Sequence, residues 1–244
     1  MPTPNSARNR LIVALDFPSS DLALHLVDQL ESQCTWFKVG LELYLATGSS
    51  IVTSLRKRGF NVFLDLKLHD IPNTVASAVR SVSSLGASLL TVHAVGGSAM
   101  LSAAAEAAAA TTDAPRILAV TVLTSMDAPQ LHGIGVADSP AAQVLRLGKL
   151  AEAAGIDGLV CSPEEIPQLR TSLARIPLLV VPGIRPAGSA AGDQRRIATP
   201  RTAIAAGASM LVVGRPITEA VDPAKAVEAI LAEMTAAIAS ESTC

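Results

Sequence analysis

The chain has 244 residues, of which 50% are hydrophobic, 16% are charged and only 2% are aromatic, and its formal net charge is −2. This profile is typical of a globular protein with a core of Val, Leu, Ile and Ala. So small a charge gives no attraction to nucleic acids or anionic membranes, and we exclude both as partners.

The cysteines and the amino terminus argue against a disulfide-rich, zinc-binding, secreted or membrane protein. Cys34, Cys161 and Cys244 are widely spaced and odd in number, so neither a disulfide framework nor a zinc site is expected. The first ten residues, MPTPNSARNR, are polar and lack the apolar stretch of a signal peptide, and no apolar run is long enough to span a membrane. We expect a soluble cytoplasmic protein with a polar tail over residues 1–10.

Eight short apolar runs follow one another along the chain, with helix-like segments between them. The runs are 11–16, 36–40, 61–67, 88–93, 116–123, 157–162, 177–183 and 209–214. They are continuously apolar rather than alternating, which is typical of parallel strands covered on both faces. Segments 139–155 and 222–239 begin with Ser or Asp followed by Pro, a common helix start. Further helix candidates are 19–32, 74–86 and 98–110.

Strands that alternate with helices, with no linker between them, predict an α/β fold, a single-domain (β/α)8 or TIM barrel over residues 1–244. A doubly wound open sheet is the alternative, but the GxGxxG dinucleotide signature is missing from the sequence. In a TIM barrel the active site lies at the carboxyl ends of the strands. Candidate catalytic residues are therefore expected at those ends.

Charged residues gather at the ends of the first three predicted strands. The stretch FLDLKLHD contains Asp65 and Lys67, which are two residues apart on a strand and so share a face. A structural salt bridge that closes the barrel mouth would explain this pair alone. Asp16 and Lys38 at neighbouring strand ends favour a functional cluster instead, because buried charges need partners.

Two other strand-end residues are interpreted as structural. His93 ends the fourth strand, and we expect it to be held there by hydrogen bonds, since the sequence places no acidic partner for it. Cys161 ends the sixth strand, and we expect inert packing, because nothing near it in the sequence would activate the thiol.

The ends of the last two strands predict a phosphate site, as is common in TIM barrels. Gly214 and Arg215 follow the eighth strand and precede a predicted helical turn, where backbone amides and a guanidinium can bind phosphate. The preceding loop, 182–196, has three glycines and many small residues, which suits a mobile lid. A solvated basic loop is the alternative interpretation. The polar candidates in this loop are Arg185, Gln194, Arg195 and Arg196.

Six sequence blocks support a family assignment. Between residues 14 and 218 the chain contains, in this order, ALDFP, FKVGLELY, LDLKLHDIPNTV, TVLTSM, PGIRPAGSAAGDQRR and VVGRPIT. These blocks resemble those of the bacterial form of the orotidine 5′-monophosphate decarboxylase family. The resemblance implies a carboxy-lyase that converts orotidine monophosphate to uridine monophosphate in pyrimidine biosynthesis. It also implies that the reaction uses no cofactor and no metal.

The resemblance assigns catalytic roles to the charged cluster. Lys67 would be the proton donor within an array that also contains Lys38, Asp65 and Asp70. Asp16 and Lys38 would hold the ribose hydroxyls, and Asp65 would lie beside the departing carboxylate of the substrate.

Further residues would bind the rest of the substrate. Thr124, together with Ser125, would hold the pyrimidine. The resemblance places Asp70 and Thr74 in the partner's active site across the interface of a homodimer. The phosphate would be held by Arg185, Gln194, Gly214 and Arg215.

Three alternatives share parts of this pattern. A magnesium-dependent enzyme like 3-keto-L-gulonate 6-phosphate decarboxylase has the same barrel and a DxKxxD motif, but its extra acidic metal ligands are not evident at the other strand ends. A Schiff-base aldolase would need a neutral Lys67, whereas two flanking aspartates favour the ammonium form. The third alternative is a non-catalytic phosphosugar-binding barrel.

Overall fold

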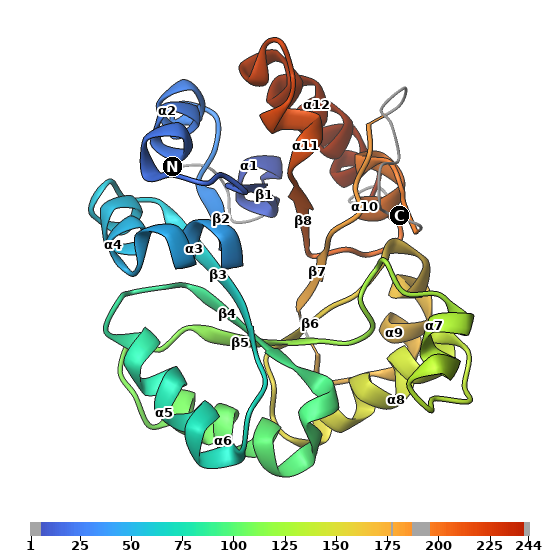
Figure 1. The fold of residues 1–244 in the computed structure, drawn as a ribbon. Coiled ribbons are helices and arrows are strands. Elements are labelled where there is room, and N and C mark those ends of the chain that lie inside the picture. The colour runs from blue at the N-terminus through green and yellow to red at the C-terminus, as the bar shows by residue number, and fades with distance from the viewer. Residues whose placement is uncertain (1–5, 177, 187–195, 242–244) are drawn as a thin grey trace.

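The computed structural model describes residues 6–176, 178–186 and 196–241, and it shows the predicted barrel (Figure 1). Eight parallel strands pair in sequence order, and β8 pairs with β1 to close the barrel. The strands are β1 (Leu11–Ala14), β2 (Trp36–Gly40), β3 (Asn61–Leu68), β4 (Leu89–His93), β5 (Arg116–Val120), β6 (Gly158–Val160), β7 (Leu178–Val181) and β8 (Met210–Val213). All eight predicted strands are therefore confirmed, although several end two or three residues earlier than the apolar runs do.

Helices surround the strands on the outside (Figure 1). The five predicted helices are α2 (Ser20–Leu30), α5 (Pro72–Ser83), α6 (Gly97–Ala109), α8 (Pro140–Ala153) and α12 (Pro223–Glu241). The Ser-Pro and Asp-Pro starts act as predicted, because Ser139 accepts a hydrogen bond from Ala142 N and Asp222 accepts one from Lys225 N. The helix after β8 is short, α11 (Arg215–Thr218), as the sequence suggested.

Several short helices were not predicted, since segments of one or two turns carry little periodic signal. They are α1 (Ala7–Arg10), α3 (Leu41–Thr47), α4 (Ser50–Lys57), α7 (Ala128–Gly133), α9 (Ile166–Ser172), α10 (Pro200–Ala205) and the 3-10 turns Ala94–Gly96 and Pro163–Glu165. No described helix has the length and apolar character needed to cross a membrane.

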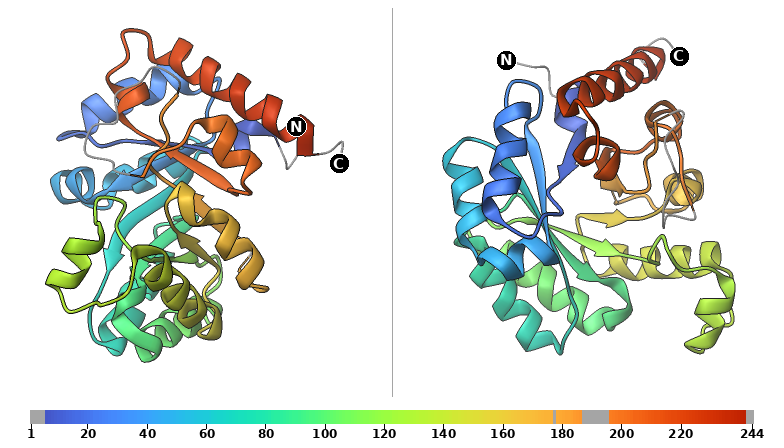
Figure 2. Two further views of the ribbon diagram at one scale, coloured as in Figure 1. Left: turned by 90° about the vertical axis from the view of Figure 1, so that its right-hand side faces the viewer. Right: turned by 45° about the horizontal axis from the view of Figure 1, so that its top comes forward.

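The amino-terminal segment is partly built into the fold. Residues 7–10 of the predicted polar tail form α1, where Ala7 is buried and Arg10 Nε donates to the carbonyl of Ser209 at 3.0 Å. Helix α12 lies beside α1, α2 and α10, so both ends of the described chain contribute to one side of the outer layer (Figure 2).

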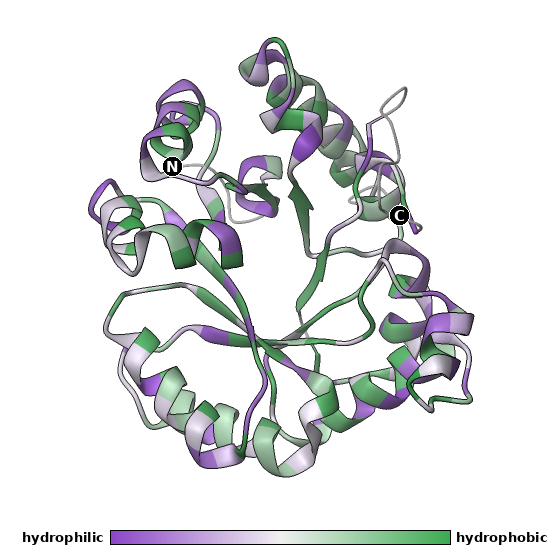
Figure 3. Cartoon of the chain, in the orientation of Figure 1, coloured by the Kyte–Doolittle hydropathy of each residue, from purple (hydrophilic) through white to green (hydrophobic). Residues whose placement is uncertain are grey.

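Apolar side chains form two layers, one between strands and helices and one inside the barrel. The hydropathy colouring is mostly green along the strands and mixed along the helices (Figure 3). The interior layer contains Ile12, Ala14, Phe63, Leu89, Leu118, Val180, Met210 and Val212. Because side chains alternate along a strand, residues two positions further on also point inward. Asp16, Asp65 and Thr91 therefore continue the inward rows of Ala14, Phe63 and Leu89 toward the barrel mouth.

Candidate active site

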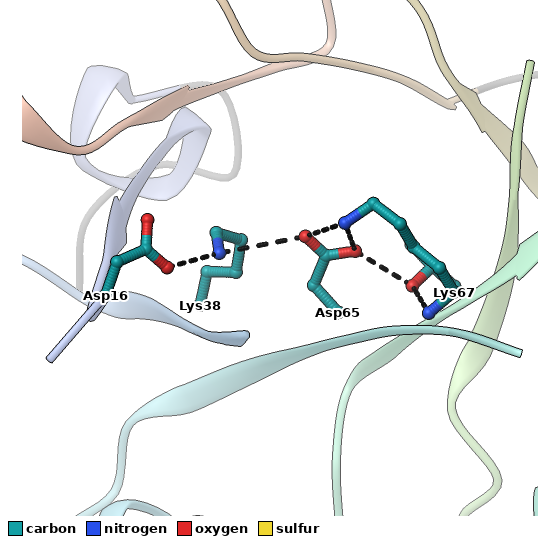
Figure 4. A network of polar contacts seen from close by, with 5 residues as sticks. Asp16, Lys38, Asp65 and Lys67 are labelled. Carbon is teal, nitrogen blue, oxygen red and sulfur yellow. Dashed lines mark hydrogen bonds and ion pairs between the residues drawn. The ribbon is translucent and has the colours of Figure 1, made fainter. Parts of the chain in front are cut away.

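Four charged side chains form a continuous row across the mouth of the barrel (Figure 4). Lys38 Nζ donates to Asp16 Oδ1 at 2.8 Å and lies 3.7 Å from Asp65 Oδ2. Lys67 Nζ lies 2.9 Å from both carboxylate oxygens of Asp65. The signs alternate along the row, so each charge inside it has an opposite neighbour. These are the four residues that the sequence placed at the ends of the first three strands.

Lys67 reaches Asp65 through an irregular backbone. The strand is not regular as predicted, because the pairing of β3 with β4 shifts register between Leu64 and Leu68. Lys67 has φ 51°, a left-handed conformation that costs a non-glycine residue on the order of 1–3 kcal/mol. Its backbone N–H donates to Thr91 Oγ1 at 2.8 Å, which holds the distorted segment against β4.

Thr91 also supports Asp65. Its hydroxyl donates to Asp65 Oδ1 at 2.9 Å, and the threonine is fully buried. One side chain on β4 therefore fixes both the carboxylate of Asp65 and the backbone of Lys67. Thr91 could not be singled out from sequence, because a threonine inside an apolar strand resembles an ordinary β-branched residue.

The charge on Asp65 is strongly supported by its surroundings. Asp65 is only 9% exposed, and this burial on its own raises the pKa of the carboxyl. The positive charges of Lys38 and Lys67 and the hydrogen bonds from Lys67 and Thr91 outweigh burial, and they hold the pKa of Asp65 below its ordinary value. Asp65 is therefore an anion at neutral pH, and it can fix the ammonium of Lys67 in place.

Two adjoining cavities open beside the row. The first has a volume of about 260 Å³, and its polar lining includes Lys67, Asp65, Thr124 and Ser125. The rest of its lining is mostly apolar: Phe63, Val120, Val122, Leu123, Val160 and Cys161. The second has a volume of about 190 Å³ and is lined by Asp16, Arg185, Gly214 and Arg215 among others. Lys38, Pro182 and Val212 line both cavities, so the two adjoin at the barrel mouth.

Gly40 allows the first two members of the row to meet. A Cβ atom at this position would lie 2.8 Å from Lys38 Nζ and 3.1 Å from Asp16 Oδ1. A larger residue would therefore require the end of the Lys38 side chain to shift, so glycine leaves room for the contact between Lys38 and Asp16.

The other predicted site residues lie outside the charged row. Asp70 and Thr74 are exposed, and Asp70 Oδ1 accepts a hydrogen bond from the backbone N–H of Ile71 at 2.6 Å. Among the described residues, no hydrogen bond or ion pair joins Asp70 to the charged row. Arg185 is buried, and Gln194 and Arg195 lie outside the described residues.

His93 is the last residue of β4 and lies close to His69, with 5.8 Å between the ring centroids. Its Nδ1 is buried and has no hydrogen-bond partner among the described residues, so the expected hydrogen bond is not found at this atom. Burial, followed by the charges of His69 and Lys67, lowers the pKa of His93 and favours the neutral ring. Burial raises the pKa of Cys161 and keeps its thiol protonated, in line with the packing role expected from sequence.

Comparison with known proteins decides the family. A sequence model of the Orotidine 5'-phosphate decarboxylase / HUMPS family matches residues 9–230. The chain belongs to this family. It is 55% identical over 228 residues to the orotidine 5'-phosphate decarboxylase of Halorhodospira halophila, covering 93% of this chain and 97% of that one. The enzyme of the same name from Pseudomonas paraeruginosa is 52% identical over 231 residues, covering 94% and 99% of the two chains.

A crystal structure of orotidine 5'-phosphate decarboxylase from Lactobacillus acidophilus has the same fold. It matches with a TM-score of 0.80 and 39% sequence identity, and the match covers 92% of this chain and 98% of that chain. Nearly the whole of this chain therefore has the fold of a decarboxylase of known structure.

Arg196, one of the arginines of the loop predicted to bind phosphate, does not line either cavity. Arg196 is buried and forms an ion pair with Glu165 instead of facing the cavities. Glu165 was not predicted from sequence, although an acid in the stretch VCSPEEIPQL directly after a buried strand was a usable signal. In the described part of the chain, no group of three or more His, Cys, Asp or Glu side chains is arranged to hold a metal ion.

Proposed function

We propose that this protein is an orotidine 5′-monophosphate decarboxylase, a carboxy-lyase of pyrimidine biosynthesis. The observation that carries the proposal is the ammonium of Lys67, held by the buried carboxylate of Asp65 at the edge of a cavity with an otherwise mostly apolar lining. Membership of the family and high identity to two proteins named for this activity support the same conclusion.

The two cavities suit the two ends of a nucleotide. The base would occupy the first cavity, which Thr124, Ser125 and Lys67 line. Lys38, which lines both cavities, and Asp16, which lines the second, would hold the ribose hydroxyls. The phosphate would occupy the second cavity. The residues that would bind it are Arg185, Gly214 and Arg215, with Gln194 from the loop after β7.

The chemistry explains why fixed charges are needed. When the bond between C6 of the pyrimidine and its carboxylate breaks, carbon dioxide leaves and the electron pair remains on C6. That pair lies in the plane of the ring, so the ring carbonyls cannot delocalise it, and a preorganised charge has to stabilise it. The ammonium of Lys67 supplies this charge and then transfers a proton to C6, and solvent restores the proton on the lysine.

Asp65 has two roles in this scheme. It orients Lys67 through two short contacts, in which its negative charge attracts the ammonium. The carboxylate of Asp65 would also lie beside the carboxylate of the substrate, and repulsion between the two anions would favour loss of carbon dioxide.

The test is turnover of orotidine monophosphate by protein treated with EDTA, followed by the change in ultraviolet absorbance. We expect full activity without any added metal or organic cofactor. Activity that EDTA abolishes and magnesium restores would instead favour an enzyme like 3-keto-L-gulonate 6-phosphate decarboxylase. Binding of uridine monophosphate with no turnover would favour a non-catalytic phosphosugar-binding barrel.

We further propose a homodimer in which Asp70 and Thr74 serve the partner's active site. Both residues are exposed and follow β3, next to Ile71, which is apolar and 66% exposed. Leu45 in α3 after β2 and Val95 after β4 are also exposed, at 79% and 52%. The segments that follow three consecutive strands, β2, β3 and β4, thus expose apolar side chains, and a second copy of the chain would cover them.

Mixing two inactive variants tests the shared site. Lys67→Ala and Asp70→Ala are combined and allowed to exchange subunits, with exchange monitored by native mass spectrometry. Random pairing makes about half the dimers mixed, and one of the two sites in each mixed dimer has both residues intact, so about a quarter of all sites should recover. If Asp70 served its own barrel, every site would keep a defect and no activity would return.

The enzyme is proposed to work in the cytoplasm as one domain over residues 1–244. Its small net charge of −2 supports a small-molecule enzyme without nucleic acid or membrane partners.

A further inference from the structure

A second buried ion pair joins the segments that follow β6 and β7. Glu165 follows β6 and is 3% exposed, and Arg196 follows β7 and is 8% exposed. Arg196 Nη1 donates to Glu165 Oε1. The other oxygen of Glu165, Oε2, accepts from the backbone N–H and the hydroxyl of Ser162, at 2.7 and 2.5 Å. The carboxylate is therefore fixed on both sides.

Arg196 also binds the segment that follows β5. Its Nη2 donates to the carbonyl of Leu123 at 3.0 Å and is 3.5 Å from the carbonyl of Val122. These residues follow β5, and β5, β6 and β7 are neighbours in the barrel. A planar guanidinium with several donors is suited to joining a carboxylate and backbone carbonyls in a set geometry.

The segment that Arg196 holds is one wall of the first cavity. Val122, Leu123, Thr124 and Ser125 all line that cavity, and Thr124 and Ser125 face the position proposed for the base. Neither Glu165 nor Arg196 lines either of the two cavities described above. Any effect of the pair on the reaction would therefore act through the cavity wall.

Stability alone is a poor explanation for such a pair. Two apolar residues of similar volume often stabilise a buried position as well as an ion pair does, because the charges lose their hydration. A directional contact to two consecutive carbonyls, by contrast, defines where a loop lies. We propose that Glu165 and Arg196 are positioning residues, which set the place of the Val122–Ser125 wall relative to Lys67. The catalytic consequence of this inference rests on the proposed decarboxylase function.

The test replaces both charges together. In Glu165→Met/Arg196→Met, two apolar side chains of similar length fill the site, so no single charge is left buried. Arg196→Lys keeps the positive charge but loses the guanidinium fork. As a matched control, Asp28→Met/Arg58→Met removes an ion pair on the outer surface, where Arg58 Nη2 lies 2.6 Å from Asp28 Oδ1.

We expect the double variant to fold with a lower melting temperature than the wild type, because the backbone N–H of Ser162 and the carbonyl of Leu123 lose their side-chain partners. A misplacement of about 1 Å can cost on the order of 100-fold in rate, so kcat/KM for orotidine monophosphate should fall roughly 10- to 100-fold, mainly through kcat. Arg196→Lys should recover part of this loss, and the surface control should match the wild type. Wild-type kcat/KM in a folded double variant would overturn the proposal, and so would a control that loses as much.

Hydrogen exchange provides a readout that does not depend on turnover. The amide of Met126 donates to the carbonyl of Leu123 at 2.9 Å, and its exchange reports whether the wall stays in place. Exchange at Met126 should be at least about tenfold faster in the double variant, or in Arg196→Lys if the double variant does not fold. Unchanged exchange would refute the positioning role even if the wild type failed to decarboxylate orotidine monophosphate, an outcome that would refute the proposed function alone.

Discussion

Replacement of Thr91 by valine tests whether β4 holds the catalytic lysine in its unusual conformation. The change keeps the shape of the side chain and removes only the hydroxyl, which now donates to Asp65 Oδ1 at 2.9 Å and accepts from Lys67 N at 2.8 Å. Loss of a hydrogen bond to a charged group costs at least about 1.5 kcal/mol, and a buried N–H left without a partner costs at least about 1 kcal/mol. We therefore expect the free energy of unfolding to fall by at least about 2.5 kcal/mol.

Activity should fall as well, because Asp65 and Lys67 both lose a contact that fixes them. We expect kcat for orotidine monophosphate to decrease by about 10- to 100-fold, measured by the ultraviolet assay on folded protein. The matched control is Thr121→Val, since Thr121 is also buried but its hydroxyl donates to the carbonyl of Val160, which keeps the hydrogen bond from Thr121 N. That variant should lose about 0.5–1.5 kcal/mol of stability and retain activity. Equal activities of the two variants would refute the reasoning.

Three further predictions follow from the charged row and the second cavity. Asp65→Asn should destabilise the fold most above about pH 4, because the pKa of Asp65 is lower in the folded than in the unfolded chain. Its deficit relative to the wild type should shrink as the pH falls through the folded pKa, and a constant deficit in acid denaturation curves would contradict this. Arg215→Ala should weaken binding of uridine monophosphate by roughly 10- to 150-fold and leave uridine unaffected in calorimetry, whereas equal weakening would place the phosphate elsewhere. Lys67→Ala should abolish turnover but still bind uridine monophosphate. Borohydride with substrate should trap no adduct on the wild type, and an adduct in mass spectra would support a Schiff-base aldolase instead.

The fold could be predicted from sequence because its determinants are local. A strand covered on both faces needs an unbroken apolar run, and each such run is visible without knowledge of its neighbours. The charged row was also predictable, because Asp16, Lys38, Asp65 and Lys67 stand at the ends of those runs, where a barrel brings side chains together.

The supporting contacts could not be predicted, since they join residues that are distant in the chain. The left-handed backbone of Lys67 depends on Thr91, which lies 24 residues away on β4. The partner of Arg196, Glu165, lies 31 residues away on the loop of another strand. A spacing rule for regular strands places the side chains of Asp65 and Lys67 on one face, but it says nothing about the backbone that makes their contact possible.

The irregularity of β3 limits how the charged pair could be transferred to another protein. On a regular strand, Asp and Lys two residues apart would point in one direction, but the backbone would lack the turn at Lys67 that accompanies the contact in this barrel. A designer who wished to graft the pair would therefore need to copy the register shift between β3 and β4 and a hydroxyl on the adjacent strand. The transferable unit is this two-strand segment with Thr91, and the motif DxK alone would be an incomplete design.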